Sequence, residues 1–244
     1  MNLEKLNALS EQVKAMRPLN EAEMARLREE FMIENVHDST AIEGNSLTLR
    51  ETALVLQEGI TIAEKPLRDH LEAIGYRDAF LYVIELADRE AELTEWAIKS
   101  IHSLVLINDA QNKGTYRKIP VRISGAVHTP PDALLIPEMI DELLRDYRTM
   151  KAERHMIEAI AEFHLRFEGI HPFIDGNGRT GRLLLNLELV KAGLLPINIK
   201  FADKIRYYDC FDAYYGNAHS AEAMTEMIAA YEISELEKRI AILS

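Results

Sequence analysis

Apolar residues recur at every third or fourth position along nearly all of this 244-residue chain. That spacing places them on one side of an α-helix, so it predicts a protein built mostly from helices. Two capping boxes, Asn20 with Glu23 and Thr48 with Glu51, indicate where two of the helices begin. We expect helices over roughly 3–16, 20–44, 48–59, 66–88, 94–108, 137–150, 152–168, 178–192, 203–215 and 220–242.

One segment departs from the helical pattern. In KIPVRISGAVHTPP, residues 118–131, short apolar or alternating runs lie on either side of Ser124-Gly125, and two prolines close the segment. This pattern indicates a short β-hairpin. With no internal repeat and no Pro/Gly/Ser-rich linker, the sequence predicts one compact, mostly α-helical (all-α) domain with a small hairpin.

Charge and cysteine content limit the partners and the compartment. The formal net charge is −12, whereas nucleic-acid binding needs a basic face, so we expect no nucleic-acid partner. The single cysteine, Cys210, cannot form an internal disulfide, which favours a reducing compartment. Neither an apolar leader nor a run long enough to span a bilayer is evident, so we expect a soluble, cytoplasmic protein without a membrane partner.

Residues 171–182, HPFIDGNGRTGR, contain the spacing GxGxxG of a dinucleotide-binding turn. Such a turn needs a strand before its first glycine and an acidic residue at the end of a second strand. Here a helical pattern leads up to the segment, and Glu188 lies on the helix that follows it. The context therefore strongly disfavours the dinucleotide interpretation.

A phosphate site explains the same segment better. Gly176 to Gly178 open a helix, and the free N–H groups at a helix N-terminus bind anions. Arg179 and Arg182 are three positions apart, so they share a helix face and can clamp phosphate oxygens. Asp175 suits a Mg²⁺ ion, and His171 suits a general base.

Each of these residues also has an ordinary role. A histidine before proline and an aspartate before glycine are common in turns, and arginines in the first turns of a helix are usually solvated. The base, the metal ligand, the glycine loop and both arginines nevertheless fall within one short segment. Their co-occurrence favours a phosphate site that carries its own base.

HPFIDGNGRTGR resembles in full the motif of the Fic (filamentation induced by cAMP) family, and the resemblance extends over about residues 40–230. It implies a mostly α-helical fold with a β-hairpin flap, and transfer of AMP from ATP to a Ser, Thr or Tyr hydroxyl of a target protein, releasing pyrophosphate. It further implies a base, His171; a Mg²⁺ ligand, Asp175; a phosphate cradle, Gly176, Asn177 and Gly178; a supporting Arg179; a γ-phosphate ligand, Arg182; and a core anchor, Phe173. Doc kinases, a related group, have lysine at the position of Gly178.

Residues 39–44, STAIEG, resemble the inhibitory motif of the same family. The resemblance implies that Glu43 pairs with Arg182 where the γ-phosphate would bind, with Ser39 fixing the orientation of the helix and Gly44 ending it. Local sequence alone allows an ordinary helix end with a solvated Glu43. On this basis we divide the chain into an N-terminal helical segment (1–38), the inhibitory-motif helix with the helix after it (39–60), and the catalytic core with the C-terminal helices (61–244).

The hairpin at 121–128 is either a structural ribbon or an edge that pairs with an extended target segment, and the resemblance favours the second. Tyr207 or Tyr208 could stack on adenine, or both could be core aromatics; Tyr207 is our first choice. Gly114, Arg117 and His128 resemble structural positions of the family. The remaining histidines show no metal-ligand spacing and are expected in the core or on the surface; they include His102, His155, His164 and His219.

The sequence thus predicts a protein adenylyltransferase that uses ATP and Mg²⁺ and is inhibited by Glu43. The alternatives are a deAMPylase, another Fic-type phosphotransferase acting on a protein, and a catalytically inactive nucleotide-binding adaptor. A DNA-binding regulator is disfavoured by the charge and by the short chain after the core. Self-modification and a homodimer remain open.

Overall fold

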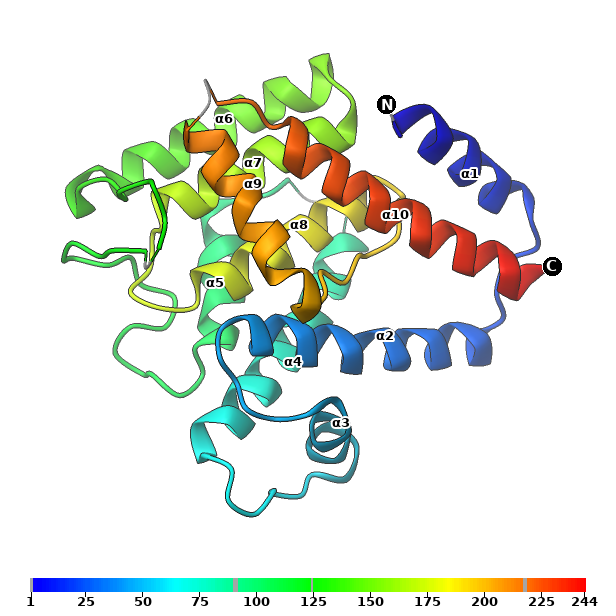
Figure 1. The fold of residues 1–244 in the computed structure, drawn as a ribbon, viewed down its shortest axis with the longest axis horizontal. Coiled ribbons are helices and arrows are strands. Elements are labelled where there is room, and N and C mark those ends of the chain that lie inside the picture. The colour runs from blue at the N-terminus through cyan, green and yellow to red at the C-terminus, as the bar shows by residue number, and fades with distance from the viewer. Residues whose placement is uncertain (1, 90–91, 124, 217–218) are drawn as a thin grey trace.

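The computed structural model describes residues 2–89, 92–123, 125–216 and 219–244, and within these ranges the protein is helical (Figure 1). The α-helices are α1 (Leu3–Ala15), α2 (Glu21–Ile42), α3 (Leu49–Glu58), α4 (Leu67–Ala87), α5 (Glu95–Val105), α6 (Ile136–Glu153), α7 (Met156–Ile170), α8 (Asn177–Lys191), α9 (Lys204–Gly216) and α10 (Glu222–Leu243). Two 3₁₀ helices, η1 (Ala133–Leu135) and η2 (Phe201–Asp203), precede α6 and α9.

The helix boundaries follow the local signals in the sequence. Both predicted capping boxes are present, because the side chain of Asn20 accepts from Glu23 N at the start of α2, and Thr48 does the same for Glu51 N at α3. Helix α2 ends at Ile42, and Gly44 follows with a φ of +96°, a left-handed conformation that favours glycine. The predicted mostly α-helical fold is confirmed.

Helix α8 lies at the centre of the bundle, in contact with α2, α4, α5 and α7. Most of its residues are buried, polar ones included, so each buried polar group needs a partner. Asn186 exchanges two hydrogen bonds with the backbone of Ile197, and Glu188 accepts from Tyr147 and Lys151. With these groups satisfied, the helix that follows the glycine loop is held from several sides.

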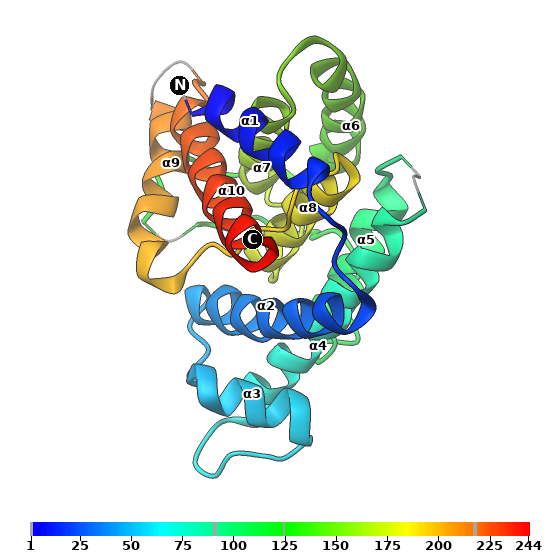
Figure 2. The same ribbon diagram turned by 90° about the vertical axis from the view of Figure 1, so that its right-hand side faces the viewer.

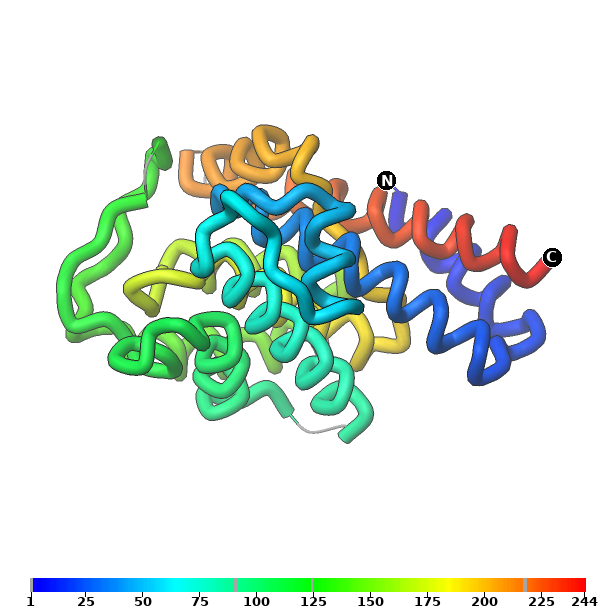
Figure 3. The backbone as a smooth tube through the Cα atoms, turned by 90° about the horizontal axis from the view of Figure 1, so that it is seen from below, coloured from blue at the N-terminus to red at the C-terminus, as the bar shows by residue number. Residues whose placement is uncertain are grey.

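Helices α1 and α10 pack side by side on one part of the bundle, and α2 packs on α3 and α4 on another (Figures 1 and 2). The last turns of α2 also contact α8 and η2. This packing brings the STAIEG segment, at the C-terminal end of α2, to the first turns of α8. Seen from below, the segment that links α5 to α6 projects from the opposite end of the molecule to the two chain termini (Figure 3).

The predicted β-hairpin is wrong in its secondary structure. No strand forms in the described part of residues 118–131, which excludes Ser124. The chain does reverse at Gly125, where φ is +80°, and Ala126 N donates to Ile123 O at 3.3 Å across the turn. We call residues 118–131 the flap segment.

The flap segment bonds to helices instead of forming a ladder between its own arms. Val127 N donates to the Asp212 carboxylate at 3.4 Å, and the His128 side chain donates to Gly169 O at 2.9 Å. A two-stranded ribbon on its own is only marginally stable. Asp212 on α9 competes for a backbone donor of the segment, and the His128 side chain ties the segment to α7. Apolar alternation could not reveal that competition.

None of the helices in the described ranges is long and apolar enough to cross a membrane.

Cys210 is buried in α9 against α10, where its thiol lies 3.9 Å from the sulfur of Met227.

Candidate active site

The segment between α7 and α8 is a tightly held loop, which we call the motif loop (residues 171–176). Helix α7 ends at Ile170, and His171 has a left-handed backbone with a φ of 49°. Asn177 fixes the loop from the first turn of α8: its side chain accepts from Phe173 N and donates to Phe173 O, both at 2.9 Å. Phe173 is fully buried, as expected of a core anchor.

His102 supports the motif loop from α5. Its ring stacks on Phe173 with centroids 3.6 Å apart, its Nδ1 accepts from Gly114 N, and its Nε2 donates to Asp175 O, both at 2.9 Å. Burial lowers the pKa of this imidazole to about 4, so the ring is neutral. The sequence placed His102 in the core or on the surface without a role; spacing in the chain gave no sign of this contact.

Arg117 joins the motif loop to both ends of the flap segment. Its side chain donates to His171 O at 2.8 Å and to Pro131 O at 2.7 Å, and its backbone N–H donates to Pro172 O at 2.9 Å. It also donates to Ile119 O at 3.1 Å. The structural role expected for Arg117 is confirmed by these bonds.

The two ring nitrogens of His171 have different roles. Its Nδ1 lies 3.2 Å from Glu168 O, and because a carbonyl can only accept, Nδ1 carries the proton. That tautomer leaves a lone pair on Nε2. Burial lowers the pKa of His171, so the imidazole is neutral at pH 7 and can accept a proton.

Arg182 is held by the last turn of α2. Its Nη2 lies 2.7 Å from Glu43 Oε1 and donates to Ser39 O at 2.9 Å, and its Nε donates to Ser39 Oγ at 2.8 Å. Burial is the largest single influence and would lower the pKa of Arg182, but the Glu43 carboxylate together with Tyr207 and Tyr76 outweighs it, and the pKa is raised. The predicted pairing between Glu43 and Arg182 is therefore present, and Ser39, which was expected to fix the orientation of the helix, is hydrogen-bonded to the same guanidinium.

Gly178 makes room for this ion pair. A Cβ atom at position 178 would lie 2.3 Å from Glu43 Oε1 and 3.1 Å from Arg182 Nη1. Any larger residue here would displace the Glu43 carboxylate from its place.

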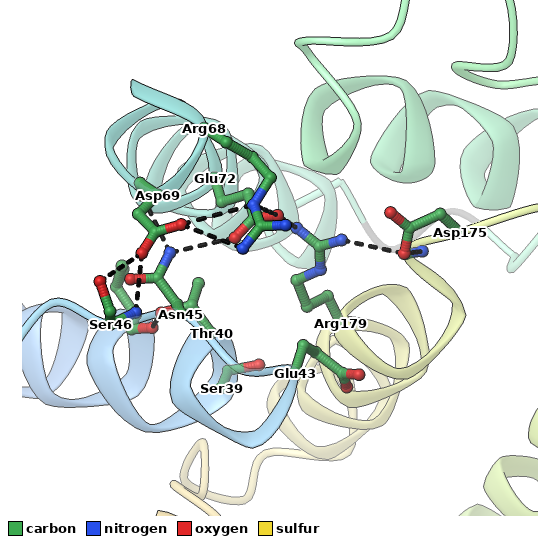
Figure 4. Close-up of polar contacts among 12 residues, drawn as sticks. Ser39, Thr40, Glu43, Asn45, Ser46, Arg68, Asp69, Glu72, Asp175 and Arg179 are labelled. Atoms are coloured by element: carbon green, nitrogen blue, oxygen red, sulfur yellow. Dashed lines mark hydrogen bonds and ion pairs between the residues drawn. The ribbon is translucent and has the colours of Figure 1, made fainter. Parts of the chain in front are cut away.

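Arg179 points from α8 toward Glu72 and Asp175 (Figure 4). Its Nη2 lies 3.3 Å from Asp175 Oδ1 and its Nη1 lies 3.6 Å from Glu72 Oε1 on α4. It is only 2% exposed, and its Nε and Nη1 have no hydrogen-bond partner among the described residues. The sequence reasoning placed both arginines on one helix face but missed Glu72, which lies more than 100 positions earlier in the chain.

A cavity of about 620 Å³ opens beside the motif loop, a volume typical of small-molecule sites. Six of the predicted site residues line it: His171, Gly178, Arg182, Tyr207, Glu43 and Gly44. The other predicted residues border the loop or α2 outside this lining: Asp175, Gly176, Asn177, Arg179 and Ser39. The flap segment contributes Arg122, Ile123, Gly125, Ala126 and His128 to the opposite wall.

The two tyrosines considered for adenine differ in exposure. Tyr207 is 1% exposed, its hydroxyl lies 2.7 Å from His164 Nε2, and the Arg182 guanidinium lies 5.8 Å from its ring centroid. Tyr208 is 39% exposed and also lines the cavity. The geometry thus gives Tyr207 a core contact and Tyr208 the larger free ring surface.

Glu168 is a buried acid in the cavity wall that the sequence reasoning did not single out. Its Oε1 has no hydrogen-bond partner among the described residues, and burial raises the pKa of this carboxyl to about 8. A neutral carboxyl is the form that an apolar environment favours. The sequence offered one clue, an acidic residue within the buried run of α7.

Asp175 fits a magnesium ion as a single protein ligand. Its Oδ1 accepts from Gly176 N and from Arg179, which leaves Oδ2 for a cation on a side chain that is 66% exposed. No group of three or more His, Cys, Asp or Glu side chains able to hold a metal occurs among the residues that the structure describes. Mg²⁺ commonly uses one or two carboxylates together with substrate phosphates and water, so one carboxylate agrees with that chemistry.

Comparison with known proteins places this site in context. Residues 92–189 match the Fic/DOC family. The protein adenylyltransferase Fic of Drosophila grimshawi is 32% identical over 210 residues, covering 84% of this chain and 43% of that protein. That of Nematostella vectensis is 33% identical over 199 residues, covering 79% of this chain and 45% of that protein. The chain thus spans less than half the length of these curated relatives.

A solved structure supports the same likeness in three dimensions. The crystal structure of a Fic domain-containing signaling protein from Bacteroides thetaiotaomicron matches with a TM-score of 0.86 at 26% identity. The match covers 98% of this chain and 96% of that one.

Proposed function

We propose that this chain, which is a member of the Fic/DOC family through its Fic domain at residues 92–189, transfers AMP from ATP to a hydroxyl group of a target protein. The observation that carries the proposal is the common wall formed by His171, Gly178 and Arg182 beside a cavity of about 620 Å³. That wall combines a neutral imidazole, a helix N-terminus and a buried guanidinium. This combination suits transfer of a phosphate-containing group.

The chemistry needs one proton acceptor. The oxygen of the target hydroxyl attacks the α-phosphorus of ATP, the bond from that phosphorus to the bridging oxygen breaks, and pyrophosphate leaves with the electron pair. His171 Nε2 takes the hydroxyl proton, because Nδ1 is already bonded to Glu168 O. The products are an AMP-modified protein and pyrophosphate.

Binding of ATP falls to the first turns of α8 and the aromatic wall. Arg182 and the N–H groups at the start of α8 hold the phosphates, with Asn177 and Arg179 supporting the loop and its neighbours. Tyr208 offers a ring surface for adenine, beside the buried Tyr207.

Asp175 Oδ2 would hold Mg²⁺ against the phosphates of bound ATP. The ion would neutralise charge that develops on the phosphate oxygens during transfer. Arg179 and Gly176 N orient the carboxylate through Oδ1.

Glu43 acts as an intramolecular inhibitor. Its carboxylate takes the hydrogen-bonding direction of Arg182 that the γ-phosphate of ATP would use, and a second anion at the same guanidinium is excluded by like charge. ATP that binds with Glu43 in place would have its α-phosphate displaced from His171. Glu43 is 32% exposed in its side chain, so it can leave without disrupting the core.

The flap segment is the docking site for the target protein. Its residues Arg122, Ile123, Gly125, Ala126 and His128 line the same cavity as His171, and its backbone forms no ladder of its own in the described residues. An extended target strand can therefore pair with it and bring a hydroxyl to His171. Self-modification would require a segment of this chain itself to pair with the flap segment and bring a hydroxyl to His171.

DeAMPylation is the second candidate. Glu43 lines the same cavity as His171, and a carboxylate in that place could orient a water molecule for attack on an AMP-modified side chain. The experiment that separates AMP transfer from kinase-type transfer and from an inactive adaptor incubates the Glu43→Gly variant in lysate with ATP labelled at the α- or the γ-phosphate. Release of AMP from a labelled protein by the wild type, and its loss in Glu43→Gly, tests deAMPylation.

AMP transfer predicts protein labelling from α-labelled ATP only, and none in the Glu43→Gly, His171→Ala double variant. Labelling from γ-labelled ATP would identify a kinase-type transfer instead. Nucleotide binding without any label transfer would support an inactive adaptor.

A further inference from the structure

A chain of polar contacts runs from Asp175 through Arg179 and Glu72 to Asn45 (Figure 4). It joins the motif loop to the turn after Glu43, which we call the inhibitory turn (residues 43–46). The two segments lie far apart in the sequence, and α4, which carries Glu72, contacts both of them.

The two carboxylate oxygens of Glu72 contact different partners, Arg179 and Asn45. Its Oε1 lies 3.6 Å from Arg179 Nη1 and 3.6 Å from Arg68 Nε. Its Oε2 accepts a hydrogen bond from Asn45 Nδ2 at 3.0 Å. The side chain of Glu72 is 11% exposed, so water competes little for either oxygen.

Arg179 depends on Glu72 for its charge balance. Its other acidic partner, Asp175, is 66% exposed in its side chain, so solvent screens that ion pair. Loss of the Glu72 carboxylate would leave a nearly buried guanidinium without a buried counter-charge. Arg179 would then move, and Asp175 Oδ1 would lose one of the two donors that orient it.

Asn45 depends on the same carboxylate on the other side. Its Nδ2 also donates to Asp69 O at 2.9 Å, and Ser46 N and Oγ donate to the Asp69 carboxylate at 2.8 and 2.6 Å. These bonds fix the inhibitory turn against α4, directly after Glu43. The turn is thereby set at a defined distance from α8.

We propose that Glu72 is a positioning residue shared by the motif loop and the inhibitory turn. One of its oxygens holds Arg179, which in turn contacts Asp175, and the other holds Asn45. One side chain therefore positions both the loop that carries Asp175 and the turn that carries Glu43. The proposal rests on the proposed function for its consequence in catalysis, but the positioning itself is measurable without catalysis.

Amide hydrogen exchange of the purified chain measures the positioning directly. We expect Glu72→Ala to speed exchange at least about fivefold in both segments, at the amides of Asn45 and Ser46 and at those of Phe173 and Gly176. Asn45→Ala should speed exchange in the inhibitory turn alone, and Arg179→Met in the motif loop alone.

Glu188→Ala is the matched control. Glu188 is 2% exposed on α8 and bridges Tyr147 and Lys151, so it is also a buried carboxylate with a cation, but it touches neither segment. Its variant should leave exchange in both segments unchanged. Faster exchange in both segments of the control, or in at most one segment of Glu72→Ala, would overturn the proposal.

Glu72→Gln keeps the proposal testable if Glu72→Ala does not fold. Glutamine retains an oxygen that can accept from Asn45 but removes the charge that balances Arg179. We expect faster exchange in the motif loop with the inhibitory turn nearly unchanged. The reverse pattern, or no change in either segment, would contradict the assignment of the two oxygens.

The rate of AMP transfer provides a separate test of the role of Glu72. In the Glu43→Gly background, Glu72→Gln should raise the Mg²⁺ concentration for half-maximal AMP transfer several-fold, with less effect at saturating Mg²⁺. If the Glu43→Gly protein transfers no AMP, the proposed function fails while the exchange result still decides the role of Glu72. If AMP transfer occurs and the exchange pattern is absent, only the positioning proposal fails.

Discussion

The two arginines at the start of α8 are both buried, but different partners neutralise them. Arg182 is 4% exposed and makes three hydrogen bonds to Ser39 and Glu43 beside the cavity. Arg179 is 2% exposed and relies on ion pairs of 3.3 and 3.6 Å with Asp175 and Glu72. We refer to these two surroundings as the cavity side and the loop side of α8.

The difference shows how one helix end can serve regulation and structure together. On the cavity side the counter-charge, Glu43, sits at the end of α2 and is partly exposed, so another anion can replace it. On the loop side the counter-charge, Glu72, is mostly buried on α4 and cannot be exchanged for a ligand without rearrangement. The proposed function assigns the γ-phosphate to the first arginine and loop support to the second.

Replacing each arginine by methionine in the Glu43→Gly background should separate the two sides most strongly. Arg182→Met should lower the single-turnover rate of AMP transfer by roughly 10²–10³-fold, because a preorganised donor to the phosphates is lost. Arg179→Met should lower it less and should raise the Mg²⁺ requirement. Equal losses in two folded variants, with no change in Mg²⁺ requirement, would remove the distinction.

Stability should differ between the two counter-charges. Glu72→Ala should lower the free energy of unfolding by about 3 kcal/mol, since it leaves a buried charge unpaired. Glu43→Ala should cost less than about 1 kcal/mol, because water can enter the cavity beside Arg182. Urea denaturation at pH 7 measures both, and a larger loss for Glu43→Ala would contradict the comparison.

The cavity side also holds Glu168, whose carboxyl has a pKa raised by burial from 4.5 to about 8. A raised pKa means that the folded state binds a proton which the unfolded state releases, so the stabilisation present below pH 4.5 is lost as pH rises towards 8. Glu168→Gln should remove this loss. We expect the variant to exceed the wild type by up to about 5 kcal/mol at pH 9 and to match it near pH 4.5.

Urea denaturation across this pH range gives the result. Parallel stability profiles for the wild type and Glu168→Gln would show that Glu168 is ionised in the fold.

The smallest expected effect concerns the base. Burial lowers the pKa of His171, so the imidazole is already neutral at pH 7. In the Glu43→Gly variant, the rate of AMP transfer should change by less than about twofold between pH 7 and 8 and should fall on the acid side of pH 6.5. A rate that climbs steeply between pH 7 and 8 would place the pKa of the base above its ordinary value.

Local signals in the sequence were sufficient for the helices and for the motif loop. Capping boxes at Asn20 and Thr48 act within one turn, so both helix starts were predictable. Residues 171–182 carry the base, the glycines and both arginines in one segment, so their proximity followed from chain connectivity. The ion pair of Glu43 and Arg182 joins distant segments, and only the family resemblance connected these two residues.

The features that the sequence did not reveal depend on packing between helices. His102 and Glu72 are single residues on α5 and α4, and nothing near them in the chain marks their contacts with Asp175 and Arg179. The flap segment was predicted as a hairpin because alternation is local, whereas a strand needs a bonded partner. In the fold, Asp212 and Gly169 on neighbouring helices accept its donors instead.

The central claim is that Glu43 occupies the place on Arg182 that the γ-phosphate of ATP needs. The most direct test compares AMP incorporation from α-labelled ATP by the wild type and by Glu43→Gly at equal protein and Mg²⁺ concentrations. Loss of one charge-assisted hydrogen bond predicts a faster rate in the variant by about 10–100-fold. Equal rates, with His171→Ala abolishing both, would show an active enzyme that Glu43 does not restrain.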